Sequence, residues 1–203
     1  KSVRVFRKIA VLTHKLGKAG KAAAKAARKG IKTAVDKTGK LIVEKGGKVI
    51  TKGDDAVKKF LDVVDIPWGS RPNPSTYLDA SYITSHLNKF DGGVTKFVSG
   101  NPTRAVGPPS GTFVLPKSQA DDLIQKAGGD PKKLEDLLGL DRGTLGDNPV
   151  RIDTNDATGL RMPDGNELGA NDNWIPGGET SGGILEATVD QIPLDKITVN
   201  PAF

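Results

Sequence analysis

The chain has 203 residues, with 25 Gly, 13 Pro, two His, no Cys and a formal net charge of +6. The absence of Cys excludes a disulfide framework, a Cys-ligated zinc site and a thiol nucleophile. No stretch carries the roughly 18 consecutive apolar residues that a membrane-spanning helix needs. Because the sequence begins with Lys1 rather than Met, we expect it to be a fragment of a larger polypeptide.

The charge is distributed unevenly along the chain. Residues 1–74 hold 19 Lys/Arg and 6 Asp/Glu, whereas residues 75–203 hold 11 Lys/Arg and 18 Asp/Glu. We therefore expect a basic leader over residues 1–70 and an acidic domain over residues 75–203. The Pro-rich segment 67–75 between them predicts an extended linker, because Pro biases its predecessor away from the α region. The leader is either a solvated, Lys-rich linker or a surface for nucleic acid, anionic membrane or an acidic partner.

The leader is expected to be mainly helical. Residues 3–15 have apolar positions near helical spacing, and the Lys/Ala/Gly-rich segment 17–39 predicts a marginal, broken helix. Residues 41–51 fit either a hairpin around two adjacent glycines or a helix with a break, and we favour the helix. Residues 54–64 predict the clearest helix, which ends before Pro67.

The acidic domain predicts an α+β fold with a small mixed or antiparallel sheet. Five short apolar runs predict its strands, at residues 94–98, 111–115, 150–153, 184–189 and 197–199. Helices are expected over residues 81–90, after Ser118 in a loose capping box, and from Asp130-Pro131 to a stop at Gly139. No internal repeat of convincing length is present.

A loop of about 25 residues separates the third and fourth strands, and a loop this long in a compact domain is usually functional. It carries Arg161, Glu167, Asn171 and Trp174 among several glycines. Glycines permit close backbone approach, Trp offers a flat surface for a ring, and Arg offers a fork for phosphate. We expect a packed, ligand-contacting loop. The alternative is that Arg161 and Glu167 only clip the loop together.

Two further residues are candidates for chemistry. Glu186 lies in an apolar run directly after the glycine-rich loop. It belongs either to an exposed sheet face or to the mouth of a cleft, where fixed negative charge would stabilise a cationic sugar transition state. His86 is the only His of the acidic domain. It is either a partly buried His bonded to a backbone partner or a catalytic or ligand-orienting group.

Several common site signatures are absent. The sequence has no G-x-G-x-x-G, Walker loop, H-E-x-x-H or G-x-S-x-G. The acidic clusters that begin at Asp153 and Asp164 fail as calcium loops, because Ala157 and Leu168 occupy the fifth position, where a ligand is required. We expect no metal site.

The segments GTFVLPKSQADDLI, LRMPDGNELGANDNWIPGG and GGILEATVDQIP resemble the C-terminal effector domains of bacterial polymorphic toxins. The resemblance covers about Tyr77 to Val199, and the leader resembles the pre-toxin region that precedes such domains. It implies a secreted effector, delivered into the cytoplasm of a competing cell. It also implies a cognate immunity protein that covers the active cleft.

Within this family, the resemblance first implies an ADP-ribosyltransferase or another NAD-consuming enzyme. In such enzymes a split α+β sandwich of short strands ends with a catalytic Glu on a late strand, the role that Glu186 matches. His86 would orient the nicotinamide ribose. Thr112 would lie on the strand that substitutes for a Ser-Thr-Ser strand, and the loop residues Arg161, Glu167, Asn171 and Trp174 would bind the substrate.

Two alternatives remain open. A metal-independent RNase toxin would use His86 with Glu167 or Glu186 as acid and base, and Arg161 on the scissile phosphate. The net negative charge of the domain disfavours it, because a phosphate backbone selects a positive groove. The other alternative is non-enzymatic: the leader lies on or inserts into anionic membrane and the acidic domain is an adaptor.

Overall fold

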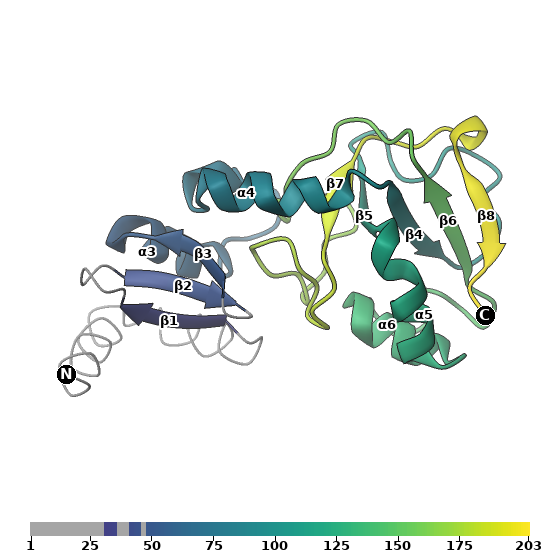
Figure 1. Cartoon of the computed structure of the whole chain (residues 1–203), viewed down its shortest axis with the longest axis horizontal. Helices are drawn as coiled ribbons and strands as arrows, with labels where there is room; N and C mark the ends of the chain where they lie inside the picture. The colour runs from purple at the N-terminus through teal and green to yellow at the C-terminus, as the bar shows by residue number, and fades with distance from the viewer. Residues whose placement is uncertain (1–30, 36–40, 46–47) are drawn as a thin grey trace. The chain divides into compact units, whose positions relative to one another are not determined.

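The computed structural model describes residues 31–35, 41–45 and 48–203, and the chain divides into two compact units, Lys1–Thr84 and Ser85–Phe203 (Figure 1). The division falls after the expected linker at 67–75. Pro74, in the 3₁₀ turn η1 (Pro74–Thr76), is buried, and so is Tyr77, whose ring packs edge-on against Phe60 with the centroids 6.0 Å apart. The Pro-rich segment therefore leads into the core of the first unit.

The first unit contains a three-stranded antiparallel sheet in the order β1-β2-β3, followed by helix α3. The elements are β1 (Ile31–Val35), β2 (Leu41–Lys45), β3 (Lys48–Lys52) and α3 (Asp54–Val63). Val43 and Ile50 of the sheet and Val57 and Phe60 of the helix are all buried.

The helix predicted over residues 54–64 is confirmed as α3, but the helix favoured over residues 41–51 is wrong and the hairpin alternative is correct. The part of the 17–39 prediction that falls in β1 is also a strand. Pairing with neighbouring strands lets the β-branched residues of this segment bury one face of the sheet. The local sequence alone does not decide between helix and strand. The helix predicted over residues 3–15 and the rest of 17–39 lie outside the described residues.

The second unit confirms the α+β fold class. Its sheet has five antiparallel strands in the order β7-β5-β4-β6-β8. The strands are β4 (Val94–Val98), β5 (Thr112–Pro116), β6 (Val150–Thr154), β7 (Ala187–Val189) and β8 (Thr198–Pro201). β7 is shorter than the predicted strand 184–189, because Leu185 instead forms an isolated bridge with Glu179 of the preceding loop.

Short helices precede and connect these strands. They are α4 (Ala80–Leu87), η2 (Asn88–Phe90), η3 (Lys117–Gln119), α5 (Ala120–Ala127), α6 (Pro131–Leu138) and η4 (Leu194–Lys196). α4, which crosses the division between the units, and η2 come before β4, and the others lie between strands. α6 begins as predicted: the Asp130 carboxylate accepts a hydrogen bond from the Lys132 amide at 2.9 Å, and Gly139 ends the helix in the left-handed conformation. The expected cap at Ser118 is wrong, since α5 follows the turn η3 without a side-chain cap. No helix in the described ranges is both long and apolar enough to cross a bilayer.

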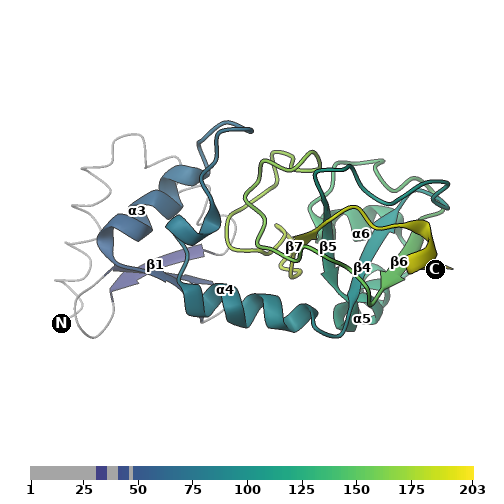
Figure 2. The same ribbon diagram turned by 90° about the horizontal axis from the view of Figure 1, so that it is seen from above.

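Each face of the sheet has its own core. α5 and α6 lie together against the face that carries Phe97 and Leu115, as Figures 1 and 2 show. The opposite face buries Val94, Val114 and Ile152 against apolar residues of the surrounding loops and η2. In both views the loop between β6 and β7 extends beyond β7 (Figures 1 and 2).

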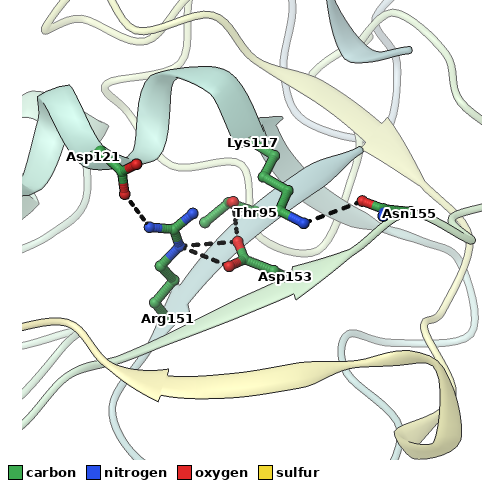
Figure 3. A network of polar contacts seen from close by, with 6 residues as sticks. All are labelled: Thr95, Lys117, Asp121, Arg151, Asp153 and Asn155. Atoms are coloured by element: carbon green, nitrogen blue, oxygen red, sulfur yellow. Dashed lines mark hydrogen bonds and ion pairs between the residues drawn. The ribbon is translucent and has the colours of Figure 1, made fainter. Parts of the chain in front are cut away.

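A polar network joins β4, β6 and α5 (Figure 3). The Thr95 hydroxyl donates to the Asp153 carboxylate, and the Arg151 guanidinium binds both Asp153 oxygens, at 3.0 Å and 2.8 Å from Nε. Arg151 also pairs with Asp121 of α5. Burial opposes the charge of Arg151, but the hydrogen bonds to the two carboxylates raise its pKa above the ordinary value. The network therefore ties the β4–β6 pair to the helix that covers it.

Candidate ligand cavity between two strands

The central strand β4 pairs unequally with its two neighbours. It pairs with β6 through all five of its residues. With β5, within the described residues, it pairs only through Val94↔Pro116 and Thr95↔Leu115. Beyond Thr95 the two strands therefore separate, and the backbone groups between them need other partners.

A cavity of about 240 Å³ is lined by both strands at this separation. Its walls come from four segments: β4, β5, the end of α6 with the residues that follow it, and the loop that leads into β7. The lining residues are Thr95, Lys96, Phe97, Phe113, Val114, Leu115, Leu138, Gly139, Leu140, Thr144, Gly169, Ala170, Asn171, Asn173, Trp174, Thr180, Ser181, Leu185 and Glu186. Nine of these 19 residues have apolar side chains, and Lys96 and Glu186 are the two that carry charge.

Lys96 bridges the gap between the separated strands. Its ammonium donates to the Phe113 carbonyl of β5 at 3.2 Å and so replaces a partner that strand pairing would have supplied. Burial lowers the pKa of this ammonium from 10.5 to about 8, and the negative charge of Glu186 opposes the change. The Lys96 ammonium and the Glu186 carboxylate, both from residues that line the cavity, therefore attract one another electrostatically.

The backbone of Glu186 is fixed on both sides. Its amide donates to the Gly178 carbonyl at 2.8 Å, and its carbonyl accepts from His86 Nε2 at 2.9 Å. Because a carbonyl can only accept, Nε2 carries the proton. Gly178 has a φ of +73°, and a Cβ there would lie 2.7 Å from His86 Nε2 and 2.8 Å from Met162 Cε. Glycine is required at this position, and the close approach holds Glu186 in place.

The loop wall is attached to the carboxyl end of α6. Asn171 and Asn173 both donate their side-chain amides to the Gly139 carbonyl, at 3.0 Å and 3.3 Å. The Thr180 hydroxyl donates to the Leu137 carbonyl at 2.7 Å. These bonds satisfy carbonyls that a helix end leaves without intrahelical partners. The polar loop residues therefore shape the cavity, and three aromatic residues, Phe97, Phe113 and Trp174, are among those that line it.

Three of the residues predicted to form a site line this cavity: Glu186, Asn171 and Trp174. His86 does not. Its ring is buried and packs against Phe90, with the centroids 5.6 Å apart, and it holds the backbone of Glu186. The expected contact of His86 with a ligand is therefore replaced by a positioning role.

Arg161, Glu167 and Thr112 also lie outside the cavity walls. Arg161 donates to the Gly159 and Ser110 carbonyls at 2.7 Å and 2.9 Å and pairs with Asp190 at 3.1 Å. Its guanidinium is thus committed to holding neighbouring backbone segments. The expected phosphate contact does not fit this geometry.

Glu167 and Thr112 also hold the fold together and do not face the cavity. The Glu167 carboxylate accepts from the amides of Asp164 and Gly165, at 3.0 Å and 2.8 Å, and burial raises its pKa. It clips its own loop, but not to Arg161 as the alternative proposed. Thr112 is buried and pairs with Val189 of β7.

Sequence reasoning missed Lys96 and Phe113. A signal for Lys96 was present, because period-2 alternation in β4 puts this lysine on the same face as Val94 and Val98. A lysine on an otherwise apolar strand face indicates either a buried partner or a site. Phe113 gave no comparable signal, since an aromatic residue in a short strand is ordinary core composition.

Among residues 31–35, 41–45 and 48–203, no cluster of three or more His, Cys, Asp or Glu side chains could hold a metal ion. No protein-family model matches the chain, and no curated protein matches its sequence.

Proposed function

We propose that the acidic domain is the enzymatic domain of a bacterial toxin that consumes NAD, by hydrolysis or by ADP-ribosyl transfer, with Glu186 as its catalytic carboxylate. One observation carries the proposal: Glu186 lines a cavity together with nine apolar residues, among them the aromatic residues Phe113 and Trp174. A carboxylate beside flat apolar surfaces suits a ligand that combines an aromatic ring with a sugar.

The chemistry follows from where charge develops. Breaking the bond between nicotinamide and ribose leaves positive charge on the ribose carbon and releases a neutral ring. The fixed negative charge of Glu186 would stabilise that cation, and apolar walls strengthen the interaction because they exclude water. The released ring would stay against Trp174 or Phe113 until a water or a target side chain attacks the ribose carbon.

The cavity holds only part of such a ligand. At about 240 Å³ it is smaller than the roughly 300–1,000 Å³ of most small-molecule pockets. We assign it to the nicotinamide and its ribose, with the adenosine half outside.

The RNase alternative is less well supported. Its mechanism would need His86 and Arg161, with Glu167 or Glu186, around one phosphate. Of these residues Glu186 lines the cavity, but His86, Glu167 and Arg161 do not. Each is bonded to backbone groups instead.

The biological part of the proposal rests on the resemblance of the domain to polymorphic toxin effectors. The domain would act in the cytoplasm of a competing cell, and an immunity protein would cover the cavity. The leader, with 19 Lys/Arg and 6 Asp/Glu through residue 74, would contact anionic membrane during delivery.

The test is nicotinamide release from NAD by the purified chain, with total RNA as a parallel substrate. We expect nicotinamide release that falls about 10²–10³-fold in Glu186→Gln, because the variant keeps the shape of the side chain and loses its charge. Asp195→Asn, an acid-to-amide change at an exposed position of η4 outside the cavity lining, is the matched control and should retain the rate.

Two results would contradict the proposal. One is an unchanged rate of nicotinamide release in Glu186→Gln. The other is cleavage of RNA without added metal and no release of nicotinamide, which would favour the RNase.

A further inference from the structure

We infer that Lys96 is a covalent attachment site for a small aldehyde, such as the open-chain form of a sugar, bound in the cavity between β4 and β5. The inference does not depend on NAD consumption. It starts from the position of Lys96, which is a lining residue of the cavity where the two strands separate and whose ammonium reaches the Phe113 carbonyl of the facing strand.

The surroundings of Lys96 meet the needs of an amine nucleophile. Phe97, Leu115 and Leu185 line the same cavity as Lys96, so the ligand space beside this lysine has largely apolar walls. The hydrogen bond from the Lys96 ammonium to the Phe113 carbonyl, at 3.2 Å, holds the amine at the cavity wall. Lysines that form imines are typically desolvated in apolar pockets, because the neutral amine is the reactive form.

The lowered pKa agrees with this geometry. With a pKa of about 8, the free-amine fraction of Lys96 near neutral pH is roughly 200-fold higher than that of a lysine at the ordinary value. Among the cavity-lining residues, all within the described range 48–203, Glu186 is the other group that titrates. Its charge acts on the Lys96 ammonium, which makes Glu186 the candidate to exchange a proton with this amine.

The reaction balances without any added reagent. The ammonium gives a proton to Glu186, and the nitrogen lone pair adds to the aldehyde carbon. A proton then moves from nitrogen to the former carbonyl oxygen, which gives the carbinolamine. Glu186 returns its proton to this hydroxyl, the C–O bond breaks, and water leaves as the nitrogen lone pair closes a protonated imine. The remaining N–H can still donate to the Phe113 carbonyl.

The experiment is reductive labelling of the full chain with glycolaldehyde and cyanoborohydride, followed by peptide mapping. Lys133, an exposed lysine on α6, is the internal comparison in the same digest. Near neutral pH we expect Lys96 to be labelled at least about tenfold faster than Lys133, since its lower basicity offsets part of the gain in free amine. The labelling rate of Lys96 should level off above about pH 8, whereas that of Lys133 keeps rising.

Two controls make the result interpretable. Lys96→Arg should lose the fast-labelled site and keep the labelling of Lys133, because a guanidinium forms no reducible imine under these conditions. Circular dichroism before labelling verifies that the chain is folded. Labelling of Lys96 at or below the rate of Lys133 in the folded chain would overturn the inference.

Discussion

The two edges of β4 differ in how many of its residues pair with the neighbouring strand. On the β6 side the full strand is paired, and Thr95, Asp153 and Arg151 add side-chain bonds across it (Figure 3). On the β5 side two residue pairs suffice, and a cavity occupies the rest. One strand is thus fixed along one edge while a cavity opens beside its other edge.

On the β6 side of β4, which we call the closed side, a nearly buried carboxylate needs charged or hydrogen-bonding partners. The β5 side is the open side. The Asp153 side chain is only 10% exposed, and an ionised carboxylate there is tolerated because Arg151 and Thr95 satisfy it. The open side meets a similar demand with a single lysine that satisfies the Phe113 carbonyl. The two sides should therefore respond differently to loss of a cation.

The largest expected effect comes from breaking the closed side. Arg151→Met removes the partner of a nearly buried carboxylate, and we expect a loss of about 3–5 kcal/mol in the free energy of unfolding, measured by urea denaturation. Arg142→Met is the matched control. Arg142 pairs with Asp136 where both side chains are about 60% exposed, so its loss should cost about 0–1 kcal/mol. Equal effects in the two variants would contradict the comparison.

On the β5 side of β4, the expected effect is a dependence of stability on pH that comes from Lys96. The pKa of Lys96 is about 8 in the folded chain and 10.5 as its ordinary value. Between these pH values the unfolded chain binds more protons, so the stability of the wild type rises with pH. Relative to Lys96→Met, which has no such group, the gain should reach at most about 3 kcal/mol. Urea titrations at pH values across this window measure it, and parallel curves for the two proteins would exclude a desolvated ammonium.

A smaller effect is expected where the loop holds Glu186. Gly178→Ala adds a methyl group against His86 and Met162 in addition to the strain of its positive φ. We expect it to cost about 1–3 kcal/mol more than Gly183→Ala. Gly183 also has a positive φ, of +85°, but nothing lies within 4 Å of an added Cβ. Thermal unfolding of the two variants compares these costs, and equal losses would show that the contact with His86 does not constrain Gly178.

The sequence was sufficient for the elements of the second unit whose signals are local. Asp130-Pro131 and Gly139 mark the two ends of α6 within ten residues of sequence, and short apolar runs mark the five strands. The same local reasoning failed at residues 41–51. Helix and hairpin signals were balanced there, and pairing with β1 and burial against α3 decided the outcome.

The cavity could be predicted only in part. Glu186 and Trp174 were identifiable because an acidic residue in an apolar run and a Trp in a glycine-rich loop are unusual. The separation of β4 from β5 could not be predicted, because it depends on how the strands pair and not on the local sequence of either strand. The contact of His86 with Glu186 joins residues that are 100 positions apart, beyond the reach of any local pattern.

If NAD binds in this cavity as proposed, it lies close to Trp174, whose fluorescence then reports the binding. The chain has two Trp residues, and Trp68 is 53% exposed in the first unit, so Trp68→Phe leaves Trp174 as the only indole. Titration of this variant with NAD, at concentrations through roughly ten times the 1 mM upper end of common KM values, should produce a saturable change in Trp174 fluorescence. Emission that stays unchanged over this range, once corrected for absorbance by NAD, would contradict the account.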